Sequence, residues 1–229
     1  MQPNRPATPC SVQRLGLVDY QEAWEEQRRL VEACRRDGHG RLLLLEHPPT
    51  YTLGARGKQE HLLLSEASLA KVGATVHRVD RGGDVTFHGP GQLVGYPILD
   101  IRQWNQGPVW YVCSLEEALI EALATFGIAG ERKKGQPGVW VGGAKIAAIG
   151  VRVSRGITSH GFALNVEPDL GYFSYIVPCG LPDVAVTSMA RELREVPRMD
   201  EVIDAVIEAF GHIFPVELRE MAFEARAAS

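Results

Sequence analysis

The chain has 229 residues, 45% of them hydrophobic and 23% charged, which is typical of a globular protein of one large or two small domains. Its formal net charge of -4 lacks the basic footprint that nucleic acid requires. No run approaches the roughly 18 apolar residues of a membrane helix, and the start "MQPNRPATPC" has no apolar segment of signal-peptide type. We therefore expect a soluble cytoplasmic protein that binds neither nucleic acid nor membrane.

The first half of the chain predicts a capped helix followed by strands. Asp19, with Glu22 three residues later, forms a capping box at the start of a helix over "DYQEAWEEQRRLVEACRR". The run "RLLLLEH" predicts a buried strand, "SEASLAKVG" a short helix and "ATVHRV" another strand. Between Asp80 and Tyr96, five glycines interrupt a strand, turn and strand pattern, as expected where a backbone turns tightly or approaches a ligand.

The second half predicts two helices around a set of strands. One helix covers "PVWYVCSLEEALIEALATFG", beginning at Pro108, and "MDEVIDAVIEAFGHIF" forms the last. Between them lie two strands joined at Gly142-Gly143 and the strand "ITSHGFALNV". Because strands and helices do not alternate regularly, the pattern predicts an α+β fold. We expect one domain over residues 13–216, with tails at 1–12 and 217–229.

The four cysteines are unevenly spaced and form no CxxC pair, which favours neither a zinc site nor a disulfide framework. Cys34 and Cys113 fall on apolar helix stripes and are interpreted as small hydrophobic residues, whereas Cys10 falls in the predicted tail. Cys179, in "VPCGLP", follows no helix or strand period. It is either a buried loop residue or a nucleophile.

A nucleophilic thiol needs a basic or cationic neighbour. His88 in "TFHGPG" and His160 in "SHGFA" each precede a glycine and are candidates, whereas His47 and His77 are assigned structural roles. Lys145 stands in "GGAKIAAIG" among small and apolar residues. It lies either on the solvent face of a strand or beside a pocket, where burial lowers its pKa and a nearby thiolate raises it. These residues predict a Cys/Lys or Cys/His site without naming a substrate.

The segment "RGGDVTFHGPGQLVGYP", Arg81 to Pro97, resembles the octanoyl transferases of lipoic acid biosynthesis. The family pattern is matched at Arg81, Gly82, Gly83, Thr86, Phe87, His88, Gly89, Gly91, Gln92 and Tyr96. The segments "LLEHPPTYTLG", "AKIAAIGVRVSRGITSHGFALN" and "PCG" agree in order and spacing. The resemblance extends from Leu15 to about Phe214.

The resemblance implies a mixed β-sheet with flanking helices, like the catalytic domain of biotin and lipoate protein ligases. It also implies transfer of an octanoyl group from acyl carrier protein to a lysine of lipoyl domains through a cysteine thioester. The family's nucleophile falls on Cys179 and its partner acid/base on Lys145. Its substrate-binding segments fall on Arg81, Gly82, Gly83, Asp84, Val85, Thr86, Phe87, His88, Ala148, Ile149, Gly150, Gly161, Phe162 and Ala163. We expect the glycines at 82, 83, 150 and 161 to leave room for the acyl chain.

The resemblance implies no ATP and no metal, and the acyl donor carries phosphopantetheine on the carrier protein. The expected acceptors are the lipoyl domains of 2-oxoacid dehydrogenase subunits and the glycine cleavage H protein, and we expect a monomer. Carrier proteins are acidic, so a basic cluster is expected to dock them. Its candidates are Arg132, Lys133 and Lys134 with Arg152 or Arg155.

Three alternatives remain open at this stage. An adenylating lipoate or biotin ligase would use ATP and would need no cysteine nucleophile. A catalytically idle carrier-protein binding module would have no use for Lys145 together with Cys179. A cysteine hydrolase using His88 or His160 would release free octanoate.

Overall fold

The computed structural model describes residues 7–177 and 184–221. Within these residues, eight strands form the main sheet, and β1 runs parallel to both β11 and β2 while the other neighbours are antiparallel. The sheet is therefore mixed, as predicted. In order across the sheet, the strands are β11 (Val216–Glu220), β1 (Thr8–Leu17), β2 (Gly40–Glu46), β6 (Gln92–Ile98), β10 (Ile157–Asn165), β9 (Ala144–Ser154), β8 (Gln136–Val141) and β7 (Glu131–Lys133).

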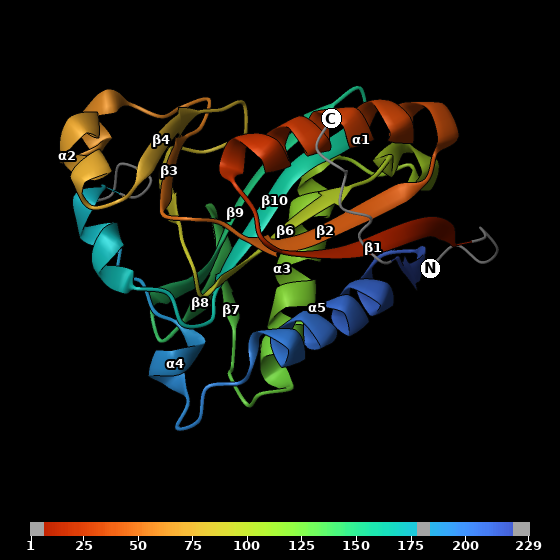
Figure 1. Ribbon diagram of the computed structural model, residues 1–229. Helices are drawn as coiled ribbons and strands as arrows, with labels where there is room; N and C mark the ends of the chain where they lie inside the picture. The colour runs from red at the N-terminus through yellow and green to blue at the C-terminus, as the bar shows by residue number, and fades with distance from the viewer. Residues whose placement is uncertain (1–6, 178–183, 222–229) are drawn as a thin grey trace.

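A second sheet of three strands lies at one end of the main sheet, beside the short helix α2 (Glu66–Lys71) (Figure 1). Its strand order is β4 (Thr75–Arg78), β3 (Thr50–Leu53), β5 (Val85–His88). Buried Tyr51, Leu69 and Phe87 belong to a separate small core under this sheet. The second sheet thus packs as a unit of its own.

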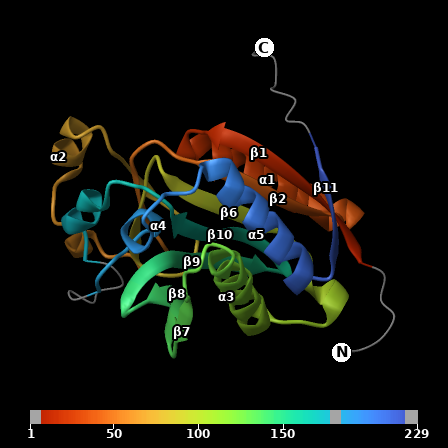
Figure 2. The same ribbon diagram turned by 90° about the horizontal axis from the view of Figure 1, so that it is seen from below.

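Helices cover both faces of the main sheet. Figure 2 shows α3 (Pro108–Ala124) and α5 (Met199–Ile213) across one face, with α1 (Tyr20–Asp37) on the other. Successive strand residues point to opposite faces, so Leu42 and Leu44 enter the core under α3 and α5, while Leu43 and Leu45 enter the core under α1. Burial on both faces explains why β2 is apolar without alternation.

The remaining elements are short. They are α4 (Met189–Glu192) and the 3-10 turns Gln59–His61, Ile101–Trp104 and Leu170–Tyr175. Among the described helices, none combines the length and the apolar character needed to cross a membrane.

The predicted N-cap at Asp19 and the predicted turn at Gly142-Gly143 are confirmed. Asp19 caps α1, with its Oδ1 accepting a hydrogen bond from the backbone N–H of Gln21 at 2.8 Å. Gly142 and Gly143, at φ 53° and 90°, form the turn between β8 and β9. Both residues have the positive φ that a tight hairpin turn of this kind requires.

The predicted tails are wrong at their inner ends. Residues 8–12 pair with β11 in register from Thr8 opposite Val216 to Val12 opposite Glu220, so both segments belong to the sheet. Cys10 is therefore a buried core residue rather than a tail residue.

The predicted burial of Cys113 is also wrong. The buried stripe of α3 runs through Tyr111, Leu115 and Leu119, which leaves Cys113 exposed.

Replacing the capping residue Asp19 with Ala should destabilise the protein by about 1 kcal/mol, because an N-cap acceptor is lost. We expect a fall of roughly 2–4 °C in Tm. Asn is a comparable cap, so Asp19→Asn is the matched control and should melt close to the wild type. Equal melting of Asp19→Ala and the wild type in calorimetry would show that the cap contributes nothing.

Candidate active site

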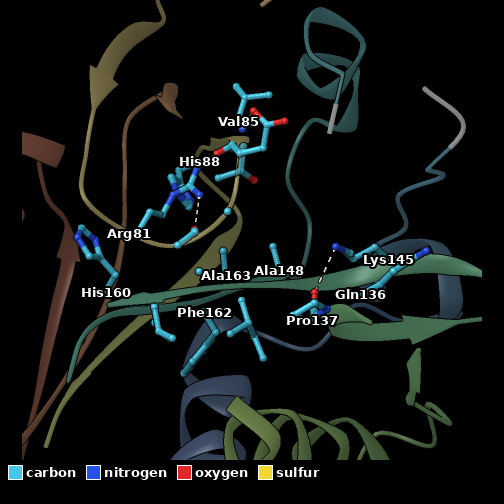
Figure 3. A pocket seen from close by; sticks show the side chains of 18 of the residues that line it. Arg81, Val85, His88, Gln136, Pro137, Lys145, Ala148, His160, Phe162 and Ala163 are labelled. Carbon is cyan, nitrogen blue, oxygen red and sulfur yellow. Dashed lines mark hydrogen bonds between the residues drawn. The ribbon is translucent and has the colours of Figure 1, made fainter. Parts of the chain in front are cut away.

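A cavity of about 700 Å³ lies over the end of the main sheet that faces the second sheet. This volume is within the range of small-molecule sites, about 300–1,000 Å³. Figure 3 shows Arg81, His88 and His160 at one end and Lys145 at the other, with Ala148 and Ala163 on the strands between them. The cavity is thus elongated along the sheet.

The cavity brings together almost all of the predicted site residues that the structure describes. The lining contains Lys145 together with Arg81, Gly82, Gly83, Asp84, Val85, Thr86, His88, Ala148, Ile149, Gly150, Gly161, Phe162 and Ala163. Phe162 borders the cavity, but its ring projects to the opposite face of the strands (Figure 3), into the core under α3. Cys179 lies outside the described residues.

Phe87 does not line the cavity, so its prediction as a substrate contact is wrong in position. It alternates along β5 with Thr86 and His88, which do line the cavity, and a strand sends neighbours to opposite sides. Its ring stacks on Tyr172 with centroids 4.7 Å apart and contacts Phe173 edge-on. Phe87 therefore supports the wall of the cavity from behind.

The guanidinium of buried Arg81 fixes the loop that forms one wall of the cavity. It donates to Thr52 Oγ1 at 3.0 and 2.9 Å, to the carbonyl of Thr52 at 2.7 Å and to that of Asp84 at 2.7 Å. The next residue, Gly82, donates its N–H to the carbonyl of Val151 in β9 at 2.8 Å. These bonds join β3, the loop and β9, and hold the wall over the sheet.

The expectation that the cavity glycines make room for an acyl chain is wrong for two of them. A Cβ at Gly150 would lie 3.1 Å from Arg81 Cδ and 3.1 Å from the Gly82 carbonyl oxygen. A Cβ at Gly161 would overlap the carbonyl oxygen of Gly95. These glycines therefore allow the protein's own backbone and the Arg81 loop to approach the sheet.

His88 is buried and neutral. Burial, reinforced by His47, lowers its pKa to about 3. Its Nδ1 lies 2.8 Å from Gln92 Oε1, while Gln92 Nε2 donates to Asn165 Oδ1 at 2.8 Å. Because the amide group of Gln92 is oriented by these bonds, Nδ1 of His88 carries the proton and donates. Nε2 is therefore the acceptor nitrogen of this ring.

The other histidines near the cavity are also held by partners. His160 contacts Asp80 through Nε2 at 2.8 Å, and burial lowers its pKa against the opposing effect of Asp80. His47 donates from Nδ1 to the carbonyl of Val18 and accepts from the Tyr96 hydroxyl, both at 2.7 Å. The structural role predicted for His47 is confirmed by these contacts.

Lys145 is a partly buried residue at the cavity end of β9. Its Nζ donates to the carbonyl of Pro137 at 3.3 Å and lies 4.7 Å from the centre of the Trp140 ring, a cation–π distance. Its backbone N–H donates to the carbonyl of Ala185 at 2.8 Å. Lys145 therefore lies beside the cavity, which is one of the two positions that the sequence left open.

Among the described cysteines, none lines the cavity. Burial raises the pKa of Cys10 to about 12 and that of Cys34 to about 11, so both remain protonated and unreactive at neutral pH. Cys113 is exposed on α3 and is not part of the lining, although its neighbour Val112 is. The chain segment that resumes at Val184 does reach the cavity, which Val184 and Val186 line.

The predicted docking residues are largely paired within the protein. Arg132 lies 3.2 Å from Glu116 and 2.5 Å from Glu117, and Lys133 donates to the carbonyl of Gly143 at 3.0 Å. Arg152 pairs with Asp80 at 2.5 Å. Carrier-protein docking by this cluster stays a prediction.

The sequence did not identify every residue of the lining. Tyr20, Tyr96, Gln92, Asn165, Trp140, Arg56 and Lys58 also line the cavity. Tyr20 belongs to the buried face of α1, and its ring also stacks on His88. Gln92 and Tyr96 belong to the matched glycine segment, so the same motif contained the signal for both.

In residues 7–177 and 184–221, no three His, Cys, Asp or Glu side chains are grouped closely enough to hold a metal ion. The lining does contain the basic side chains Arg56, Lys58, Arg81 and Lys145. Such side chains are suited to an anionic group such as a phosphate.

Comparison with known proteins matches residues 19–211 to the lipoyl protein ligase A/B catalytic domain. The chain is 49% identical over 218 residues to an octanoyltransferase of Gloeobacter violaceus, covering 94% of this chain and 95% of that protein. It is 52% identical over 208 residues to an octanoyltransferase of Chloroflexus aggregans, covering 89% and 94%.

Solved structures show the same fold at low sequence identity. A lipoate protein ligase from T. acidophilum with bound lipoic acid is 18% identical with a TM-score of 0.73, covering 94% of this chain and 90% of that one. A biotin protein ligase from Aquifex aeolicus is 14% identical with a TM-score of 0.51, covering 90% and 68%. The predicted fold class is confirmed by these likenesses.

His88 should remain neutral until about pH 3, with its proton on Nδ1. An unfolded histidine takes up a proton near pH 6.5, so His88 stabilises the fold fully above pH 6.5, and this contribution is lost as the pH falls toward 3. Nitrogen-15 NMR of the imidazole rings across this range measures both the pKa and the tautomer. A His88 midpoint near 6.5 would contradict the buried, neutral assignment.

Proposed function

Because this chain belongs to the octanoyltransferases of the lipoyl protein ligase A/B catalytic-domain family, we propose that it moves an octanoyl group from acyl carrier protein to a lysine of lipoyl domains through a thioester on Cys179. In this proposal Lys145 is the partner acid/base. The observation that carries the proposal is identity near 50% over nearly the whole chain to octanoyltransferases. The enzyme is thus an acyltransferase.

The shape and lining of the cavity support an acyl substrate. Ala148 and Ala163 present small apolar side chains toward the space between the Arg81 end and the Lys145 end (Figure 3). At the far end, burial lowers the pKa of His88 and of His160, and the Arg81 guanidinium is already bonded to Thr52 and Asp84. An octanoyl chain has roughly seven carbons beyond its carbonyl, and at about 0.8 kcal/mol per buried CH₂ it would contribute about 5 kcal/mol to binding.

The first proposed step exchanges one thioester for another. Lys145 accepts the proton of Cys179, and the thiolate attacks the carbonyl of the octanoyl thioester. The bond from the carbonyl carbon to the Cys179 sulfur forms as the bond to the phosphopantetheine sulfur breaks. The leaving thiolate takes its proton from the Lys145 ammonium. Neither ATP nor a metal enters this step.

The second proposed step forms the amide. The amine of the acceptor lysine attacks the acyl-enzyme, the carbon–nitrogen bond forms and Cys179 leaves as a thiolate. Neutral Lys145 accepts the proton that the amine loses and then returns it to the Cys179 thiolate, which restores the starting state. An amide is more stable than a thioester, so the free energy released in this second step drives the overall reaction toward the acylated lipoyl domain.

The proposed donors and acceptors follow the family. The donor is octanoyl acyl carrier protein, and the acceptors are lipoyl domains, including those of 2-oxoacid dehydrogenases and the glycine cleavage H protein. A solved structure of the same fold, from Thermoplasma acidophilum, is that of a bi-partite lipoate protein ligase and its E2 lipoyl domain, which supports a lipoyl-domain acceptor. We further propose a cytoplasmic monomer.

Incubation with octanoyl acyl carrier protein should add one octanoyl group to the enzyme, at Cys179, as a thioester that hydroxylamine cleaves. Cys179→Ala should lose the adduct and the transfer together. Cys113→Ala is the matched control, because Cys113 is an exposed thiol outside the cavity, and it should form the adduct normally. Intact-protein mass spectrometry measures the mass of the wild type and of both variants after incubation.

Transfer by Cys179→Ala at a rate near that of the wild type would contradict the covalent mechanism. Release of free octanoate without an acylated lipoyl domain would instead identify a hydrolase. Binding of the donor with neither adduct nor transfer would identify a binding module.

Replacing Lys145 with Ala should suppress both half-reactions without unfolding the protein. Lys145→Arg keeps the positive charge, which can favour the thiolate, but a guanidinium does not give up its proton near neutral pH. We therefore expect acyl-enzyme formation to survive better than transfer to the lipoyl domain in this variant. Single-turnover rates of the two half-reactions, with thermal melting as the folding control, measure the difference. Unchanged rates in both variants would remove Lys145 from the mechanism.

A further inference from the structure

At Lys145, strand β9 remains paired with β8 on one side, where Trp140 lies opposite Lys145, but it has lost β10 on the other side. β10 pairs with β9 from Ile157 opposite Ser154 to Leu164 opposite Ala147, so this pairing stops short of Lys145. Residues 185–187 take over the edge: the Lys145 N–H donates to the carbonyl of Ala185 at 2.8 Å, and the Thr187 N–H donates to the carbonyl of Lys145 at 3.0 Å. The backbone of Lys145 is thereby held by a segment distant in the sequence.

Asn165 joins the end of β10 to this replacement segment. It is the last residue of β10, only 4% exposed, and it lines the cavity. Its Nδ2 donates to the carbonyl of Thr187 at 2.9 Å, and its Oδ1 accepts from Gln92 Nε2 at 2.8 Å. The side chain therefore uses both ends of its amide to bridge β6 and residues 185–187.

The direction of this bridge is fixed by its ends. The carbonyl of Thr187 can only accept, so Asn165 must present its NH₂ group there and its oxygen to Gln92. Gln92 then presents its own oxygen to His88 Nδ1, 2.8 Å away. One continuous chain of hydrogen bonds thus connects His88, at one end of the cavity, to the segment that holds Lys145 at the other.

We propose that Asn165 is a positioning residue for the acyl transfer: by anchoring Thr187, it holds residues 185–187 against Lys145 and fixes the strand that presents the Lys145 side chain. The proposal rests on the proposed function only where its effect is measured as a rate. Asp, although nearly isosteric, cannot replace Asn165, because an ionised carboxylate would face the Thr187 carbonyl with no proton to donate.

Hydrogen exchange tests the anchoring directly and needs no substrate. In Asn165→Ala, the amides of Lys145 and Thr187 should exchange at least about tenfold faster than in the wild type, since opening of the segment becomes easier. The amide of Gly82, bonded to Val151 in the same cavity wall, should be unaffected. If Asn165→Ala does not fold, Asn165→Asp at neutral pH provides the same comparison.

Thr158→Val is the matched control for a lost buried polar group. Thr158 is fully buried in β10, accepts from the Leu99 N–H at 2.8 Å and donates to the Pro97 carbonyl at 2.8 Å, and it does not line the cavity. Loss of the Thr158 hydroxyl should lower Tm, but amide exchange at Lys145 and Thr187 and the transfer kcat should stay within about twofold of the wild type.

Asn165→Ala should lower kcat by roughly 100-fold, the effect expected of a reacting group displaced by about 1 Å, with little change in KM.

The pH profile of Asn165→Asp separates positioning from general destabilisation. A protonated carboxyl can donate to the Thr187 carbonyl as the amide does, so the ratio of variant to wild-type kcat should rise as the pH falls through the pKa of the introduced group. The titratable groups connected to this position are His88 through Gln92, Glu192 through the Thr187 hydroxyl, and Lys145 on β9. These groups also titrate in the wild type, so the variant is compared with the wild type at each pH.

Wild-type exchange at the Lys145 and Thr187 amides in both Asn165 variants would overturn the proposal, and so would a wild-type kcat in both. If the wild type itself transfers no octanoyl group, the proposed function fails, while the exchange experiment still decides whether Asn165 anchors the segment.

Discussion

The buried guanidinium of Arg81 is the interaction on which the cavity depends. It binds Thr52 in the second sheet and the carbonyl of Asp84 in its own loop, while the adjoining Gly82 is bonded to Val151 in the main sheet. A cationic donor group with these acceptors holds two independently packed sheets at a fixed separation. The absence of a side chain at Gly150 permits this close approach.

This arrangement also sets the electrostatics of the cavity. Burial is the main cause of the lowered pKa values of His88 and His160, and the nearby Arg81 cation adds to it. The Arg81 end therefore carries neutral imidazoles, whereas the lysine proposed for the chemistry lies at the other end (Figure 3). An apolar chain and a proton-transfer group can then occupy one cavity without interfering with each other.

The sequence predicted what depends on local pattern. The cap at Asp19, the doubly buried strand β2 and the turn at Gly142-Gly143 are all determined by neighbouring residues, and all three are present. The pairing of Thr8 with Val216 was missed because it joins distant segments whose own patterns are weak.

In the candidate site, too, the sequence predicted the residues of a local motif but not those that are brought together only by the fold. The motif from Arg81 located most of the cavity lining, but strand alternation sends Phe87 to the other side. Tyr20 satisfies a helix stripe and also lines the cavity, so periodicity alone could not identify its second role. Asn165 gains its position only through Thr187 and Gln92, which come from different parts of the chain.

The measurement that tests the central claim most directly is the mass of an acceptor lipoyl domain after incubation with this enzyme under two conditions. One contains octanoyl acyl carrier protein without ATP, and the other contains free octanoate with ATP and magnesium. Octanoylation of the lipoyl-domain lysine only in the first condition is the predicted result. Modification only in the second would contradict the account and identify an ATP-dependent ligase of the same fold.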